Sequence, residues 1–201
     1  KNKSTIKYSP FFFSNSIFNI EDINLKLIKN INIDRILIYN DLIKVLNSKN
    51  KIIFKSKKFD NHLIDDLDLN IDLIYGKLFY SKKISIEENF FKCLGDVNLL
   101  QDYPVLYFDC LILSKDKKKL LKKFLVKYNK KKEALKIEVK GTINIFNNKI
   151  NFKTIKMNDD YKASMEDLKY FKQIFEAKIF DENIVNIFNY KKIKEFIIEI
   201  L

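Results

Sequence analysis

Few residues in this chain of 201 have the chemistry of a catalytic or metal site. His62 is the only histidine, and a hydrolytic triad would require it to lie beside a nucleophile and an orienting group. Ser56, Asp65 and Asp66 are near it in sequence, but their spacing matches no known catalytic arrangement. A metal site requires several converging ligands, which one histidine cannot supply. We therefore expect a solvated loop histidine, no catalytic or metal site, and no cofactor.

Two short acidic clusters, at residues 65–68 and 158–160, carry oxygen ligands that could hold a cation loosely. Neither has the alternating ligand spacing of a calcium loop. The three glycines, Gly76, Gly95 and Gly141, are too scattered to form a phosphate-binding loop. We interpret both acidic clusters as polar turns.

Cys93 and Cys110 are too few for a disulfide scaffold, and their spacing matches no zinc motif. If the flanking strands form a hairpin around residues 101–103, the two thiols lie at similar heights. The register then decides whether they face the same side of the sheet. Because unpaired cysteines are usually small buried hydrophobes, we expect two buried free thiols, with a disulfide as the alternative.

The net charge of +12 suggests a polyanionic partner, but the basic residues are almost all lysine. Arg35 is the only arginine, and lysine, isoleucine and asparagine are over-used together, as in proteins from AT-rich genomes. Arginine supplies the bidentate contacts that specific nucleic-acid readers favour. Its near absence argues against specific nucleic-acid binding.

Residues 115–132 form the most basic segment, with ten lysines. Attraction to anionic lipid head groups, about 1 kcal/mol per lysine near such a surface, is one interpretation. A solvated face enriched in lysine by codon usage is the other. The head-group candidates are Lys117, Lys118, Lys119, Lys122 and Lys123.

The elements that would position these residues are mainly strands, because apolar residues recur with period two from residue 17 to about 157. Such alternation gives a strand one apolar and one polar face, and one-sided sheets are usually antiparallel. We therefore predict a curved, twisted antiparallel sheet with meander topology and a groove-like shape. The clearest apolar rows are Leu67, Leu69, Ile71 and Leu73; Leu135, Ile137, Val139, Ile143 and Ile145; and Ile31 with Ile33.

Turn residues predict hairpin links at residues 47–50, 101–104 and 147–149. Gly76, Gly95 and Gly141 lie inside strand-like patterns, where glycine often marks a bulge or a bend.

Helical signals are few. A short helix is expected over residues 115–124, capped by Ser114, and a longer one begins at Ser164, where Asp167 completes a capping box. A last helix runs from Ile184 or Tyr190 to Leu201. We expect two parts: a sheet domain at residues 1–160 and a helical cap at 161–201 that covers the open end of the sheet.

No run of about 20 apolar residues predicts a membrane-spanning helix, and no signal peptide is recognisable. Because the chain begins with Lys1 rather than Met, we expect a fragment or a processed form.

Two stretches carry a family resemblance: LKIEVKGTINIFNNKINFKTI at residues 135–155 and GDVNLLQDYPVLYF at residues 95–108. Both resemble the strand pairs of AsmA-like proteins, and the tail at 163–201 is similar to the helical C-terminal end of some members. The resemblance implies a groove-shaped sheet on the periplasmic side of a bacterial inner membrane, anchored by a membrane helix elsewhere in the parent chain. It also implies a role in moving or positioning lipids.

The leading hypothesis is a non-enzymatic envelope segment that binds phospholipid or another acyl lipid along an apolar sheet face. Each buried CH₂ group would contribute about 0.8 kcal/mol. The alternative is a structural or protein-interaction module of the envelope with a closed core; a basic nucleic-acid-binding domain and an enzyme rank below both. The lipid-facing candidates are Leu67, Leu69, Ile71, Leu73, Leu135, Ile137, Val139, Ile143 and Ile145.

Overall fold

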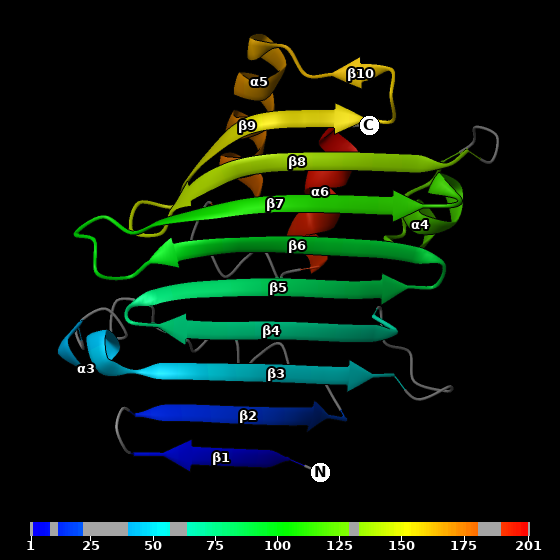
Figure 1. Ribbon diagram of the computed structural model, residues 1–201. Coiled ribbons are helices and arrows are strands. Elements are labelled where there is room, and N and C mark those ends of the chain that lie inside the picture. Colours follow the sequence, from blue (N-terminus) through cyan, green and yellow to red (C-terminus); the bar gives the residue numbers. More distant parts are fainter. Residues whose placement is uncertain are drawn as a thin grey trace.

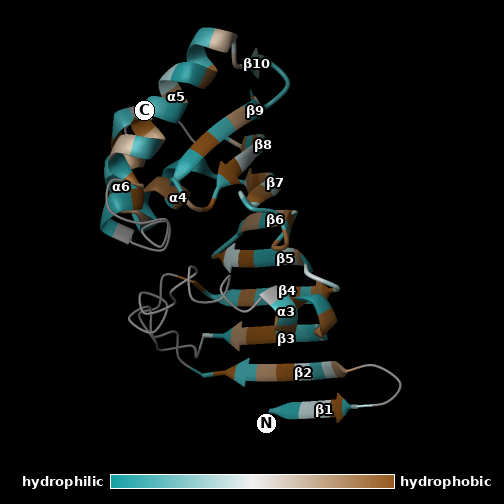
Figure 2. Ribbon diagram, turned by 90° about the vertical axis from the view of Figure 1, so that its left-hand side faces the viewer, coloured by the Kyte–Doolittle hydropathy of each residue, from teal (hydrophilic) through white to brown (hydrophobic). Residues whose placement is uncertain are grey.

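The computed structural model describes residues 2–8, 12–21, 40–56, 64–128, 133–180 and 190–200. They form one open sheet of ten strands, and each strand lies beside its neighbours in sequence (Figure 1). Three helices, α4, α5 and α6, lie on one side of this sheet (Figure 2). The predicted class, mainly β with helices at the C-terminal end, is confirmed. The strands are β1 (Lys3–Lys7), β2 (Phe13–Ile20), β3 (Asn47–Lys55), β4 (Asp66–Ile74), β5 (Lys77–Ile86), β6 (Asn89–Asn98), β7 (Val105–Ser114), β8 (Leu135–Asn144), β9 (Lys149–Met157) and β10 (Tyr161–Lys162), and the helices are α3 (Asn40–Val45), α4 (Lys117–Lys123), α5 (Met165–Lys178) and α6 (Tyr190–Ile200).

Neighbouring strands are antiparallel with one exception, the parallel pair β2–β3. The sheet is therefore mixed, and the predicted meander begins only at β3. Parallel strands cannot be joined by a tight turn, so the link between β2 and β3 is a longer crossover that includes α3. The predicted strand containing Ile31 and Ile33 lies in this crossover, outside the described residues.

The predicted hairpin links after β6 and after β8 are confirmed, but the turn predicted at residues 47–50 is wrong. These residues begin β3, where the sheet satisfies their polar side chains. The Asn50 side-chain amide donates to the Ser48 hydroxyl at 3.0 Å and to the Ile71 carbonyl at 3.3 Å. The Asn47 side-chain oxygen accepts a hydrogen bond from the Tyr75 N–H at 3.2 Å. A polar run thus forms a strand because its partners lie on the next strand.

The glycines play different roles. Gly141 lies at a register shift between β8 and β9, which confirms the predicted bulge. Gly76 is instead in the β4–β5 turn with φ +81°, a conformation that favours glycine. Gly95 lies in regular strand β6, where an added Cβ would be 1.9 Å from the Tyr107 carbonyl oxygen and 2.8 Å from the Tyr80 ring. Close approach, rather than a bend, therefore accounts for Gly95.

The helix starts follow their local chemistry. Ser164 and Asp167 form the predicted capping box at α5, with reciprocal hydrogen bonds of 2.8 and 3.1 Å. Helix α4 is present, but its cap is Asp116, which accepts from the Lys119 N–H at 3.2 Å. Ser114, the predicted cap, instead accepts from the Asp116 N–H. For the last helix, a start at Ile184 lies outside the described residues.

A packed core forms where α5 and α6 lie over β8 and β9. Phe175 of α5 makes edge-to-face contacts with Phe152, Phe180 and Phe196, at centroid distances of 5.8, 5.0 and 5.2 Å. The two helices therefore cover the face of the sheet at its C-terminal end, while the short strand β10 pairs with β9 at the edge. The buried members of this cluster are Ile143, Ile150, Phe152, Ile179 and Phe180.

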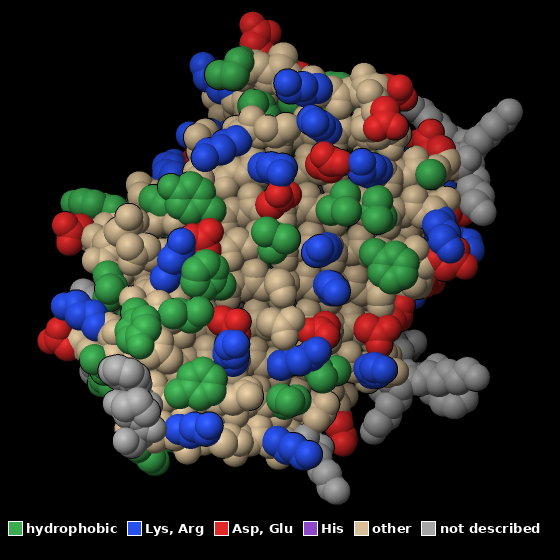
Figure 3. All heavy atoms as spheres, viewed as in Figure 1, with side chains coloured by type: hydrophobic (Ala, Val, Ile, Leu, Met, Phe, Trp, Pro, Cys, Tyr) green, Lys and Arg blue, Asp and Glu red, His purple; other side chains and the backbone are tan. Residues whose placement is uncertain are grey.

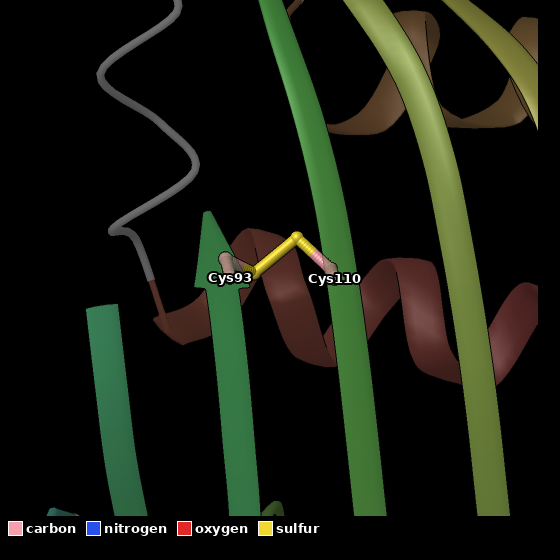
Figure 4. The surroundings of a disulfide bond; sticks show 2 residues. All are labelled: Cys93 and Cys110. Atoms are coloured by element: carbon pink, nitrogen blue, oxygen red, sulfur yellow. A yellow bond between two sulfur atoms is a disulfide. The ribbon is translucent and has the colours of Figure 1, made fainter. Parts of the chain in front are cut away.

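Cys93 and Cys110 form a disulfide between β6 and β7, so the prediction of free thiols is wrong (Figure 4). The hairpin register pairs them directly, and their Cα atoms are 4.1 Å apart. Directly paired residues point to the same face of a sheet, which brings the two sulfurs together. Both side chains are half-buried rather than buried.

Candidate functional site

The nine candidate lipid-facing residues all lie on the helix-covered face, and none is among the exposed side chains. The four residues of β4 are half-buried. On β8, Leu135 and Ile143 are only 7% and 6% exposed, and Val139 packs beside Ile143 in the cluster under α5 and α6. Ile145, just after β8, packs against the cluster around Ile43 of α3. Leu135, Val139 and Ile143 are therefore buried or packed under a second layer rather than facing an open trough, whereas Ile137 is half-buried.

The opposite face, which we call the front face, is the one seen in Figure 3. Charged side chains of both signs alternate across its strands. Lys51 pairs with Asp68 at 2.9 Å, Lys77 with Asp96 at 3.1 Å, and Lys140 with Asp109 at 2.6 Å. The hydrogen bond to Asp109 raises the pKa of Lys140, and the hydrogen bond from Lys136 lowers the pKa of Glu138.

Large apolar side chains also lie exposed on the front face, between these charges. Phe90 is 55% exposed, Tyr107 48%, Leu94 44% and Leu113 40%. The alternation argument assigned this face to polar residues and so missed them. One signal could have revealed them: apolar residues at consecutive positions, as at Phe90 and Phe91 and at residues 111–113, must place apolar groups on both faces.

A shallow cavity of about 460 Å³ opens on the front face over β3–β7. We call it the β3–β7 trough. It lies between two adjacent rows of cross-strand neighbours. One row contains Phe90 and Leu113, and the other contains Lys92 and Leu111. The lining residues at front-face positions are Ile53, Lys55, Asp66, Asp68, Lys83, Ser85, Phe90, Lys92, Leu111 and Leu113, and the residues between them on the same strands, Phe54, Leu67, Ile84 and Phe91, complete the lining.

Lys83 and Lys92 are direct cross-strand partners in the trough. Asp68 is opposite Lys83 in the register, but its carboxylate binds Lys51. Asp66 accepts a hydrogen bond from the Ser85 hydroxyl at 2.9 Å. Within the described ranges, neither Lys83 nor Lys92 has an ion-pair partner, and the whole lining holds three lysines and two aspartates.

The five head-group candidates of α4 fall into two groups: two contact other side chains, and three are exposed to solvent. Lys117 lies 3.7 Å from Glu133 and 4.9 Å from the centre of the Tyr128 ring, and Lys123 pairs with Glu87 at 3.2 Å. The other three candidates are exposed: Lys118, Lys119 and Lys122. Helix α4 lies on the side of the sheet opposite the trough (Figure 2).

Lys82 is an unpredicted feature of the helix-covered face. It faces Leu69 on one side and Cys93 on the other, and burial lowers its pKa. Tyr80 is two residues away on the same face, and burial raises its pKa to about 12. A cation that is held among apolar neighbours favours its neutral form.

The acidic cluster at residues 158–160 forms a turn, as predicted, but Asp66 and Asp68 of the other cluster lie in β4, so the interpretation of that cluster as a turn is wrong. Asp65 accepts a hydrogen bond from the Glu87 N–H, and Asn158 accepts one from the Lys136 N–H at 2.8 Å. His62 lies outside the described residues. In the part of the chain that the structure describes, no three His, Cys, Asp or Glu side chains converge as metal ligands would. In the same residues, no helix is both long and apolar enough to cross a bilayer.

Comparison with known proteins found no similarity: no protein-family model, curated protein or solved structure matches this chain. The AsmA-like resemblance therefore stays a prediction.

Proposed function

We propose that this chain is a non-enzymatic lipid-handling protein whose front face binds the surface of an anionic phospholipid membrane. One observation carries the proposal: exposed aromatic and aliphatic side chains lie between lysines across one broad sheet face. Apolar side chains gain about 25 cal/mol per Å² when they leave water. Lysines near an anionic membrane contribute about 1 kcal/mol each.

The charge balance of the front face supports this partner. On β1 and β3–β9, lysines at front-face positions outnumber carboxylates, and several of them are paired within the face. The remaining lysines give a net positive surface suited to diffuse attraction rather than shaped recognition. By strand alternation, the lysines are Lys3, Lys7, Lys49, Lys51, Lys55, Lys77, Lys83, Lys92, Lys136, Lys140, Lys149 and Lys156, and the carboxylates are Asp66, Asp68, Asp72, Asp96, Asp109 and Glu138. Lys153 of β9 also reaches this face, where its ammonium group lies 5.3 Å from the centre of the Tyr107 ring.

The envelope location and the AsmA-like family belong to the same proposal. A disulfide such as Cys93–Cys110 is typical of proteins in oxidising compartments, which include the bacterial periplasm. Acyl-chain binding on the helix-covered face is kept for the half-buried β4 candidates, Leu67, Leu69, Ile71 and Leu73, because Leu135 and Ile143 of β8 are buried and Val139 packs in the core.

Co-sedimentation with vesicles tests the membrane interface. We expect binding to vesicles that contain phosphatidylglycerol and little binding to pure phosphatidylcholine. Phe79→Ser together with Leu94→Ser removes two exposed front-face side chains and should weaken binding. The matched control is Leu42→Ser with Met165→Ser, two exposed residues of α3 and α5. No binding to anionic vesicles, or an equal loss in the control, would refute the proposal.

A protein-interaction role is the second candidate, because strand β1 is an exposed edge. All five of its residues are exposed, and β2 is its partner in the described sheet. An open edge presents unpaired backbone groups that can accept a further strand. Sedimentation velocity over a concentration series tests whether a second copy supplies that strand. A monomer at every concentration would exclude self-association through β1.

A further inference from the structure

We propose that the β3–β7 trough binds one molecule of an anionic phospholipid, with the phosphate between Lys83 and Lys92 and the acyl chains over Phe90, Leu111 and Leu113. This inference rests on the proposed function and adds to it a discrete site with a defined orientation.

The lysine pair supplies the head-group contact. Like charges directly opposite each other on neighbouring strands destabilise a sheet, and Lys83 and Lys92 are such a pair. Of the two carboxylates in the trough, Asp68 is paired with Lys51, and Asp66 accepts a hydrogen bond from the neutral Ser85 hydroxyl and keeps its charge. An anion between the two ammonium groups would convert their repulsion into two attractive contacts. Phosphate suits lysine, which acts as a compact point charge with rotatable donors.

The apolar half of the trough begins directly beside this pair. In the register, Lys92 faces Leu111, and the next row pairs Phe90 with Leu113. Phe90 and Leu113 are 55% and 40% exposed, so their apolar surface is available to a ligand. A phosphate alone would use only the lysines and a neutral hydrocarbon only the apolar side chains. A molecule that joins both groups uses the whole site.

The size of the trough suits a lipid molecule, and the residues along its length determine which way that lipid lies. Its volume of about 460 Å³ lies within the range of about 300–1,000 Å³ for small-molecule sites. It crosses five strands, which corresponds to about 19 Å at about 4.8 Å per strand spacing. In the same row, Asp68 on β4 and Glu138 on β8 are each paired with a lysine, Lys51 and Lys136. The lysine pair therefore places the head group at β5–β6, and Phe90, Leu111 and Leu113 place the acyl chains over β6 and β7.

The test uses a short-chain phosphatidic acid below its critical micelle concentration, titrated into the isotope-labelled full chain and followed by NMR. We expect saturable shifts at residues of β5–β7. Lys83→Gln with Lys92→Gln should weaken binding about thirtyfold, from about 1 kcal/mol per lysine. The control, Lys127→Gln with Lys169→Gln, removes the same charge from exposed positions after α4 and on α5, outside the front face, and should leave the affinity unchanged.

Three outcomes would overturn the site. They are an equal loss in the Lys127 and Lys169 control, shifts that spread over the front face without saturating, and inorganic phosphate that binds with the same affinity as the lipid. Vesicle co-sedimentation of the wild-type chain, compared with its binding of the monomeric lipid, separates the two proposals. If the wild-type chain binds anionic vesicles but not the monomeric lipid, the discrete site is refuted and the membrane interface stands. If it binds the monomeric lipid and not the vesicles, the membrane interface is refuted and the site stands.

Discussion

Replacing Cys93 and Cys110 together by alanine should lower the stability of the protein substantially. The disulfide joins residues 17 apart in sequence, and closing a loop of that length removes conformational entropy from the unfolded chain. The loop-closure relation gives about 3 kcal/mol for a loop of about 15 residues. For a chain of this size, about 3 kcal/mol corresponds to a melting temperature about 6–12 °C lower.

The assay is thermal unfolding followed by circular dichroism, on oxidised wild type, reduced wild type and the double variant. Reduced wild type controls for the lost sulfur packing, because it keeps both side chains and loses only the bond. It should melt close to the variant and well below the oxidised protein. Thiol titration of the denatured chain without reductant should find no free thiol.

Two results would refute this reasoning. Free thiols in the unreduced protein would show that the β6–β7 register does not bring the sulfurs together. Equal melting temperatures with and without reductant would show that the bond does not constrain the unfolded chain.

Three further predictions concern single side chains. Ser164→Ala should cost about 1 kcal/mol by removing the α5 cap, and Ser164→Asp should restore most of it; unchanged urea unfolding of the alanine variant would contradict the cap. Gly95→Ala should destabilise the sheet by about 1–3 kcal/mol or more, because its Cβ would overlap the Tyr107 carbonyl, whereas Ala134→Gly, outside the strands, should change little. Lys82→Met should raise the melting temperature at neutral pH and Lys83→Met should not. Burial lowers the pKa of Lys82, so its charged form destabilises the folded protein below that lowered pKa, and this destabilisation disappears as pH rises to the ordinary pKa of lysine. The increase in melting temperature from Lys82→Met should therefore be smaller at pH 10.5 than at pH 7, and an equal increase at both pH values would contradict this origin.

Local patterns predicted the elements with strong local signals. The β8 alternation, the α5 capping box and the Gly141 bulge depend on residues within a few positions of one another, and all three are confirmed. The first part of β3 was mistaken for a turn because its polar side chains bind groups on β4 and in the β4–β5 turn. Propensity along one strand contains no information about such partners.

The candidate site was less predictable, for a geometric reason. Alternation correctly grouped Leu67 and Leu135 with other apolar residues on one face, but it could not show that helices cover part of that face. Alternation also gave no role to Phe90 and Leu113, because each is next to another apolar residue in sequence, where the apolar–polar alternation is interrupted. The lysine pair of the trough requires the β5–β6 register, which depends on the turn between the strands rather than on either strand.

The order of the strands also bears on how the protein holds together. From β3 to β10 every strand pairs only with the strands before and after it in sequence, so the sheet behaves as a linear array of nearest-neighbour interfaces. Loss of pairing at one interface then affects the rest of the sheet only through the adjacent interface. The crossover between β2 and β3 is the longest-range step in this array, so the β1–β2 pair can separate while β3–β10 stay folded. We expect unfolding to begin at the β1–β2 end, because α5 and α6 pack over β8 and β9 at the other end. The disulfide closes an interface near the middle of the array, where separation would otherwise divide it in two.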